Sequence, residues 1–214
     1  MSRLIDTGLE QLSTMLYHMG ETAYKAVNLS ITGYISGLSY YNKVKNLSDT
    51  LVVMADELED NVFEIIARFQ PVASDLRILK SCMKIAYDFT RFGRYALDMS
   101  QIYERLGGLE KCDDWTKKYI NEMCEKVLRM VHISVDSIKL RDIKIARDIS
   151  ELEEQVDSMY FRYLEVLVEK ATTTNECRIS SVLSVRHLER IADHAAYICE
   201  SIIYLVTGQK TKLR

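Results

Sequence analysis

Pairs of acidic residues at helical spacing are the features of this sequence that could do chemistry. Residues four apart lie on the same face of a helix, so each pair presents two carboxylates side by side. Carboxylate clusters suit hard divalent cations and iron. We therefore predict six candidate metal ligands in three pairs: Asp56 and Asp60, Glu153 and Asp157, and Glu189 and Asp193.

The alternative interpretation of these pairs is a solvated acidic face with lysine and arginine nearby. The chain has 31 acidic residues, so pairs at a spacing of four arise readily by chance. Clustering is more informative, because Asp49, Asp56 and Asp60 share one helical stripe. The four histidines do not decide between the interpretations. None has an acidic residue three positions before it, as the Glu-x-x-His pattern of di-iron bundles requires.

No catalytic motif accompanies the carboxylates. The sequence contains no glycine-rich phosphate loop, no Ser/His/Asp order and no nucleophile motif. It also lacks a Lys/Arg cluster of the nucleic-acid type, and its formal net charge is −3. We therefore expect neither enzymatic activity nor nucleic-acid binding.

The elements that must position these carboxylates are helices. The 214 residues include 8 Gly and 1 Pro, whereas average usage is about 7% Gly and about 5% Pro. A chain this poor in turn-forming residues cannot supply the many turns of a β-sandwich or barrel. The hydrophobic share of 48% is enough for a sizeable core. The composition predicts an all-α fold.

Apolar periodicity and breaker residues divide the chain into six helical stretches. We place them at about 4–37, 41–68, 71–106, 114–141, 142–170 and 175–208. Pro71, the only proline, ends the second stretch because it disfavours helical geometry at Gln70. Asp114 is the expected N-cap of the fourth. Gly107 and Gly108 open the one convincing linker, so the predicted domains are 1–107 and 108–214.

The two halves resemble one another. Residues 19–31 match residues 123–135 in type at several positions, including Glu21 with Glu125. Asp56 and Asp60 align with Glu153 and Asp157 when the alignment offset between the two halves is made seven residues shorter. Seven residues are about two helical turns, so the shift keeps every side chain on its face. We predict two tandem three-helix bundles related by an internal repeat.

Cysteine usage and hydropathy indicate the compartment. The five cysteines, at positions 82, 112, 124, 177 and 199, include no CxxC pair. This pattern predicts buried apolar cysteines rather than a disulfide framework or a thiolate zinc site. No apolar run approaches the roughly 20 residues of a membrane span, and the N-terminal residues lack the apolar stretch of a signal peptide. We expect a cytoplasmic protein without membrane insertion.

Three segments of the chain carry motifs of a known protein family. Residues 70–77, QPVASDLR, resemble the QPxASDLR signature of the PhoU family of phosphate-transport regulators. Residues 188–194, LERIADH, resemble its LERIGD motif, and residues 198–209 resemble its C-terminal end. The resemblance spans essentially the whole chain and includes the internal duplication.

The resemblance implies a non-enzymatic cytoplasmic protein of two similar three-helix bundles that forms a homo-oligomer, with a dimer expected. It implies restraint of phosphate uptake and phosphate-responsive signalling. The partners it implies are a phosphate ABC transporter, through its ATPase subunit or cytosolic loops, and a sensor histidine kinase. Family members carry iron or zinc on E(D)xxxD motifs, which match the six carboxylates. A metal-binding helical protein without a signalling role is the alternative.

The first half departs from the family pattern. Residues 89–94 correspond to LERIGD, and Thr90 and Arg94 stand where the acidic residues would be. Arg94 would supply a fixed positive charge in place of a metal. We therefore expect the four second-half carboxylates to bind metal better than Asp56 and Asp60.

Overall fold

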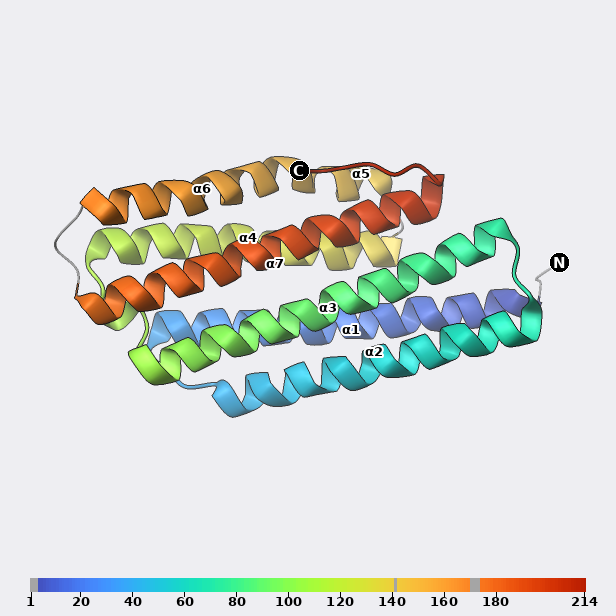
Figure 1. Ribbon diagram of the computed structural model, residues 1–214, viewed down its shortest axis with the longest axis horizontal. Helices are drawn as coiled ribbons and strands as arrows, with labels where there is room; N and C mark the ends of the chain where they lie inside the picture. Colours follow the sequence, from blue (N-terminus) through green and yellow to red (C-terminus); the bar gives the residue numbers. More distant parts are fainter. Residues whose placement is uncertain (1–3, 141, 170–173) are drawn as a thin grey trace.

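The computed structural model describes residues 4–140, 142–169 and 174–214, which form long helices joined by short connections (Figure 1). The all-α prediction is confirmed. The long helices are α1 (Leu4–Ser36), α2 (Tyr41–Phe69), α3 (Ala73–Leu106), α4 (Asp114–Leu140), α6 (Ile149–Glu169) and α7 (Asn175–Thr207). A 3₁₀ turn, η1 (Leu109–Lys111), and the short α5 (Ile143–Arg147) complete the order.

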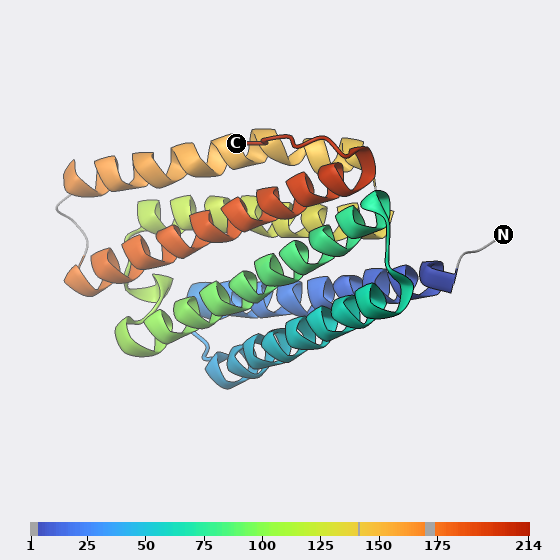
Figure 2. The ribbon, with the colours of Figure 1, turned by 45° about the vertical axis from the view of Figure 1, so that its right-hand side comes forward.

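The helices form two three-helix bundles that lie side by side (Figures 1 and 2). Helices α1, α2 and α3 pack together in the first, and α4, α6 and α7 in the second. Helix α3 packs along α7 and α1 along α4, so one hydrophobic core runs through both bundles. The division into domains 1–107 and 108–214 stays a prediction, because the bundles share that core.

Most of the predicted helix ends coincide with those in the structure. Helix α2 ends at Phe69, and the next residue, Gln70, has a left-handed φ of 45° and precedes Pro71. Gly208, with φ 75°, ends α7 by donating its N–H to the Tyr204 carbonyl. Thr174 caps the start of α7 by accepting a hydrogen bond from the Cys177 N–H. The predicted turn at residues 172–175 lies partly outside the described residues.

Two predicted helix features are wrong. The stretch at 142–170 is divided at Asp148 into α5 and α6, and neither glycine nor proline marks that break in the sequence. The N-cap of α4 is Asp113 rather than Asp114, because the Asp113 carboxylate accepts the Thr116 N–H at 2.8 Å. This one-residue shift places Asp114 in the first turn, where an acidic residue also suits the helix dipole.

The linker between the bundles depends on its two glycines. Gly107 has a φ of 83°, a left-handed conformation that L side chains rarely adopt. Gly108 lies against the Tyr34 carbonyl, where a Cβ atom would collide. The first residue of the linker therefore needs glycine for its conformation and the second for space.

The prediction against a disulfide is wrong. Cys112, just after η1, and Cys177, in the first turn of α7, form a disulfide with a Cα–Cα distance of 5.4 Å. The two residues are 65 apart in sequence, so only the packing of η1 on α7 brings them together. Cys82, Cys124 and Cys199 lie outside this disulfide and are buried, as expected.

The segment after α7 turns back along that helix (Figure 1). The Leu213 N–H donates to the Glu200 carboxylate at 3.0 Å, and the Ser150 hydroxyl donates to the Leu213 carbonyl at 2.9 Å. Leu213 itself is buried. These contacts hold residues 209–214 between the beginning of α6 and the second half of α7. Among the described helices, none is both long and apolar enough to cross a membrane.

Candidate functional site

Helices α6 and α7 bring the second-half carboxylates into one region. Glu153 of α6 and Glu189 and Asp193 of α7 are buried, each with 7–8% of its surface exposed. Asp157, one turn after Glu153, is exposed. Helices α6 and α7 pack together, and the charge of Asp193 on α7 is among the causes that raise the pKa of Glu153 on α6. The four residues of the second-half site therefore lie on two packed helices, and their binding of a metal stays a prediction.

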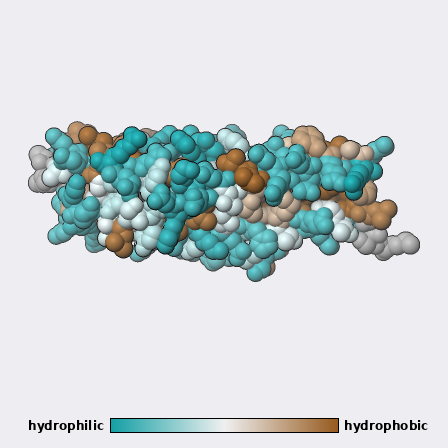
Figure 3. All heavy atoms as spheres, turned by 90° about the horizontal axis from the view of Figure 1, so that it is seen from below, coloured by the Kyte–Doolittle hydropathy of each residue, from teal (hydrophilic) through white to brown (hydrophobic). Residues whose placement is uncertain are grey.

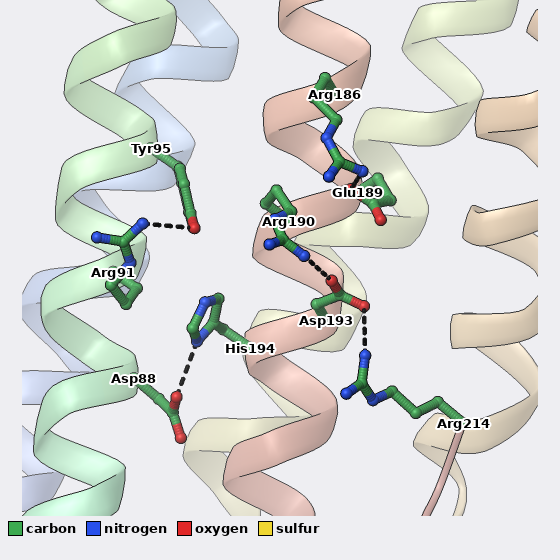
Figure 4. A network of polar contacts seen from close by, with 9 residues as sticks. All are labelled: Asp88, Arg91, Tyr95, Arg186, Glu189, Arg190, Asp193, His194 and Arg214. Atoms are coloured by element: carbon green, nitrogen blue, oxygen red, sulfur yellow. Dashed lines mark hydrogen bonds and ion pairs between the residues drawn. The ribbon is translucent and has the colours of Figure 1, made fainter.

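Arginines neutralise the two α7 carboxylates (Figure 4). Glu189 pairs with Arg186 at 2.7 Å, and Asp193 pairs with Arg190 at 2.8 Å. Each arginine lies three residues before its partner, on the same face of the helix. The second oxygen of Asp193 faces Arg214, from the segment after α7, at 3.6 Å.

Among the three buried carboxylates of this region, Glu153 is the one without such a partner. Within the described residues it makes no hydrogen bond and no ion pair at 4 Å or less. Burial, together with the negative charges of Asp193 and Asp157, raises the pKa of Glu153 to about 7, although the charge of Arg214 acts in the opposite direction. At neutral pH this group is therefore divided between its charged and protonated forms.

The pKa of Glu189 is also raised. Burial is the main cause, followed by the charge of Asp193, while Arg186 and Arg190 act in the opposite direction. Two buried carboxylates with raised pKa values therefore lie on the packed helices α6 and α7.

These side chains fit a hard cation in chemical type but are not arranged around one. Across residues 4–140, 142–169 and 174–214, no three Asp, Glu, His or Cys side chains are placed to hold a metal ion. Oxygen donors in this number suit a divalent cation or iron. The three arginine side chains are 39–44% exposed, so they can swing into solvent when a cation takes their place.

The first-half residues lie apart from this region. Asp56 and Asp60 are both exposed on α2. Arg94 pairs with Asp98 of its own helix at 3.3 Å, and the Thr90 hydroxyl donates to the Tyr87 carbonyl at 2.7 Å. In the part of the chain that the structure describes, no ion pair joins Arg94 to either Asp56 or Asp60.

A buried pair between the bundles was missed by the sequence interpretation, which gave His194 no role. The His194 Nδ1 atom lies 2.8 Å from Oδ1 of Asp88 on α3, with both residues almost fully buried (Figure 4). Burial raises the pKa of Asp88, and the hydrogen bond to His194 opposes that shift. The available signal was an acidic residue, Asp88, on the apolar stripe of α3 beside Ile85 and Phe89.

Comparison with known proteins reveals close relatives. The family model described as "PhoU domain" matches residues 16–103 and 120–202, one match in each bundle. A protein of Clostridium acetobutylicum, named phosphate-specific transport system accessory protein PhoU homolog, is 31% identical over 99% of this chain and 98% of its own length. An Archaeoglobus fulgidus protein of the same name is 29% identical over 91% of each chain.

Solved structures show the same fold. The crystal structure of PhoU from Pseudomonas aeruginosa has a TM-score of 0.87 and 28% identity, covering 95% of this chain and 99% of that one. A Streptococcus pneumoniae structure, at 20% identity, also has a TM-score of 0.87 and covers 97% of this chain. The arrangement of two bundles is therefore shared across distant sequences.

Proposed function

This chain belongs to the PhoU family, and we propose that it is an accessory protein that restrains phosphate uptake and phosphate-responsive signalling. The observation that carries the proposal is that the family matches both bundles and the relatives align over nearly the whole chain. We propose that it works in the cytoplasm by contact with other proteins rather than by catalysis. The expected partners are a phosphate ABC transporter and a sensor histidine kinase.

An apolar end of the first bundle supports a mechanism based on contact. Val72 and Leu76 are 65% and 44% exposed, and Phe69 is 38% exposed. Figure 3 shows hydrophobic surface at the right-hand end of the molecule, with further hydrophobic areas elsewhere on this face. Exposed apolar patches mark sites of protein interaction. We propose that this end, which contains most of the QPVASDLR segment, contacts the transporter's ATPase subunit or its cytosolic loops.

Exposed acidic residues on α2 would add charge complementarity to this contact. Asp56 and Asp60 lie on the outside of the same bundle, where charge influences the association rate and the choice of partner. Glu189 and Asp193 are buried and paired with arginine, so they are unsuited to a docking surface. Charge reversal at Asp56 and Asp60 should therefore weaken the contact without loss of helicity.

Affinity purification from cells grown with and without phosphate tests the proposed contact. The wild-type protein should co-purify the transporter ATPase subunit. The double variant Val72→Asp/Leu76→Asp should lose it, because each charge would have to be desolvated in an apolar contact. Val168→Asp is the matched control, since Val168 is 85% exposed on α6. Equal recovery with the double variant would contradict this assignment of the surface.

A second function, metal binding, is favoured by the unpaired Glu153. We propose that Glu153, Asp157, Glu189 and Asp193 bind iron, zinc or another divalent cation. Buried carboxylates with raised pKa values support this proposal, because a cation would offset both their desolvation and their mutual repulsion. When bound, the metal would supply fixed positive charge between α6 and α7 in place of the arginines.

We further propose that the protein is a homodimer, the most common closed form of a homo-oligomer. Light scattering of the purified protein, with and without added iron or zinc, measures this directly. A mass equal to that of one chain under both conditions would contradict the dimer.

A further inference from the structure

A second polar region lies between α3, the end of α7 and the segment after it. It is a cavity of about 290 Å³ that contains none of the four carboxylates described above. Three lysines line it, Lys80 and Lys84 from α3 and Lys210 from the segment after α7. Hydroxyl groups from both helices and from that segment face it as well, namely Ser81, Ser201 and Thr211.

The lysines of this cavity form no close ion pair within the described residues, although the Lys84 ammonium lies 5.8 Å from the centre of the Tyr197 ring and its charge lowers the pKa of Asp88. Among the described residues, no carboxylate lies within 4 Å of the ammonium groups of Lys80, Lys84 or Lys210. Lys80 and Lys84 are four residues apart on one helix face, a spacing at which like charges repel. Glu200 is the acidic residue of the lining, and one of its oxygens accepts the Leu213 N–H at 3.0 Å. The cavity therefore holds an excess of positive charge.

A buried hydroxyl in the same lining also lacks a partner. Ser81 is 2% exposed, and its Oγ atom makes no hydrogen bond within the residues that the structure describes. The Ser201 hydroxyl, in contrast, donates to the Tyr197 carbonyl at 2.8 Å. A buried polar atom without a partner costs free energy, which an acceptor bound in the cavity would recover. This observation is independent of the lysine charges and indicates the same kind of ligand.

We propose that this cavity binds a tetrahedral oxyanion of the phosphate class, either free phosphate or a phosphomonoester. Lys80, Lys84 and Lys210 would hold its charge, as lysines bind phosphate in other proteins. The Ser81 hydroxyl would donate to one of its oxygens. The volume suffices for such an anion with some hydration, since a water molecule takes up roughly 30 Å³ of liquid volume. The choice of phosphate over other oxyanions rests on the proposed function.

Isothermal titration calorimetry of the full chain tests this site. Inorganic phosphate, glycerol phosphate and sulfate are titrated separately at constant ionic strength. The wild-type protein should bind one phosphate or one phosphomonoester per chain. Tighter binding of inorganic phosphate would assign free phosphate as the ligand, and tighter binding of glycerol phosphate would assign a phosphorylated molecule. Sulfate binding as tight as that of both phosphates would overturn the assignment to the phosphate class.

Two variants separate the site from general surface charge. Lys84→Gln/Lys210→Gln should weaken binding by about tenfold or more, the usual effect of losing hydrogen bonds to a charged group. Ser81→Ala should weaken it less, and both variants should keep the wild-type circular dichroism. Lys43→Gln, an exposed lysine on α2, is the matched control and should bind as the wild type does.

Absence of saturable binding by the wild type, or unchanged binding by the double lysine variant, would overturn the site. A result that overturns the phosphate site can be distinguished from a result that overturns the proposed regulatory function. A protein that binds phosphate in the calorimeter but leaves cellular uptake unchanged would keep this site and contradict the regulatory role. The reverse outcome would keep the regulatory role and remove the site.

Discussion

The Nη1 atom of Arg214 lies 3.6 Å from Oδ1 of Asp193, so the segment after α7 returns a cation to the middle of that helix (Figure 4). The other oxygen of Asp193 faces Arg190 at 2.8 Å. The Arg214 guanidinium also lies over the Tyr197 ring, 4.2 Å from its centre. Arg214 therefore competes with any metal ion for this carboxylate.

Removing that competitor should strengthen metal binding. Arg214→Gln should raise the affinity for a divalent cation by about two- to fivefold, the range expected for a partly exposed ion pair. Titration with Zn²⁺ and Fe²⁺ under anaerobic conditions measures the change. Lys212→Gln, on the same segment, is the control and should leave the affinity unchanged. If the Arg214→Gln protein bound the metal with wild-type affinity, the result would show that Arg214 does not compete with the metal ion for Asp193.

The second-half carboxylates should bind metal better than the first-half pair. Asp193→Ala should weaken binding strongly, because it removes one of four oxygen-donor side chains. Asp56→Ala/Asp60→Ala should have a small effect, since both residues are exposed on α2. The comparison uses the same metal titration with all three proteins. Equal binding by the wild type and Asp193→Ala would rule out the assignment.

Glu153 should make stability depend on pH. Its pKa is about 7 in the folded protein, against 4.5 as the ordinary value, so the folded state binds more protons between these pH values. The free energy of unfolding contributed by this group therefore falls as pH rises from 4.5 and is lowest above pH 7. Without metal, Glu153→Gln should be more stable than the wild type at pH 8, by on the order of 2 kcal/mol.

Urea unfolding at pH 5 and pH 8 measures this difference. The advantage of Glu153→Gln should shrink at pH 5, where the wild-type carboxyl is largely protonated. Glu165→Gln, an exposed glutamate on the same helix, should show no such trend. If the Glu153→Gln protein were less stable than the wild type at pH 8, the result would contradict the conclusion that Glu153 is a buried carboxylate without a compensating charge.

The Cys112–Cys177 disulfide should stabilise the junction between the bundles. It closes a loop of 65 residues, for which the loop-entropy relation gives about 4 kcal/mol. Cys112→Ser should lower the free energy of unfolding in oxidising buffer, and a reducing agent should lower that of the wild type similarly. Cys82→Ser serves as a control for the loss of a buried cysteine outside the disulfide. Insensitivity of the wild-type protein to reductant would contradict a stabilising bond.

Features of the fold that depend on neighbouring residues in sequence could be predicted. Gly208 ends α7 and Pro71 follows the end of α2, because both act through local backbone geometry. Glu189 and Asp193 share a helix face with Arg186 and Arg190, and sequence spacing alone indicates that such pairs are possible. The division of 142–170 at Asp148 escaped prediction because no breaker residue marks it.

Features that depend on tertiary packing could not be predicted. The partner of Cys112 is 65 residues away, and the partner of His194 is 106 residues away on α3. Arg214 reaches Asp193 because Leu213 is buried and held by Glu200 and Ser150. No periodicity or motif in the sequence indicates these contacts. The pairing of the buried Asp193 carboxylate with Arg214 can therefore be seen only in the folded structure.

Phosphate uptake in a strain that lacks this gene tests the central claim most directly. The initial rate of radiolabelled phosphate uptake is measured in phosphate-rich medium, in the deletion strain and after complementation. If the protein restrains the transporter, uptake should rise on deletion and return to the wild-type rate with the wild-type gene. The Val72→Asp/Leu76→Asp gene should fail to restore it, whereas the Val168→Asp gene should succeed. An uptake rate unchanged by deletion would contradict the regulatory role and leave metal binding as the better account.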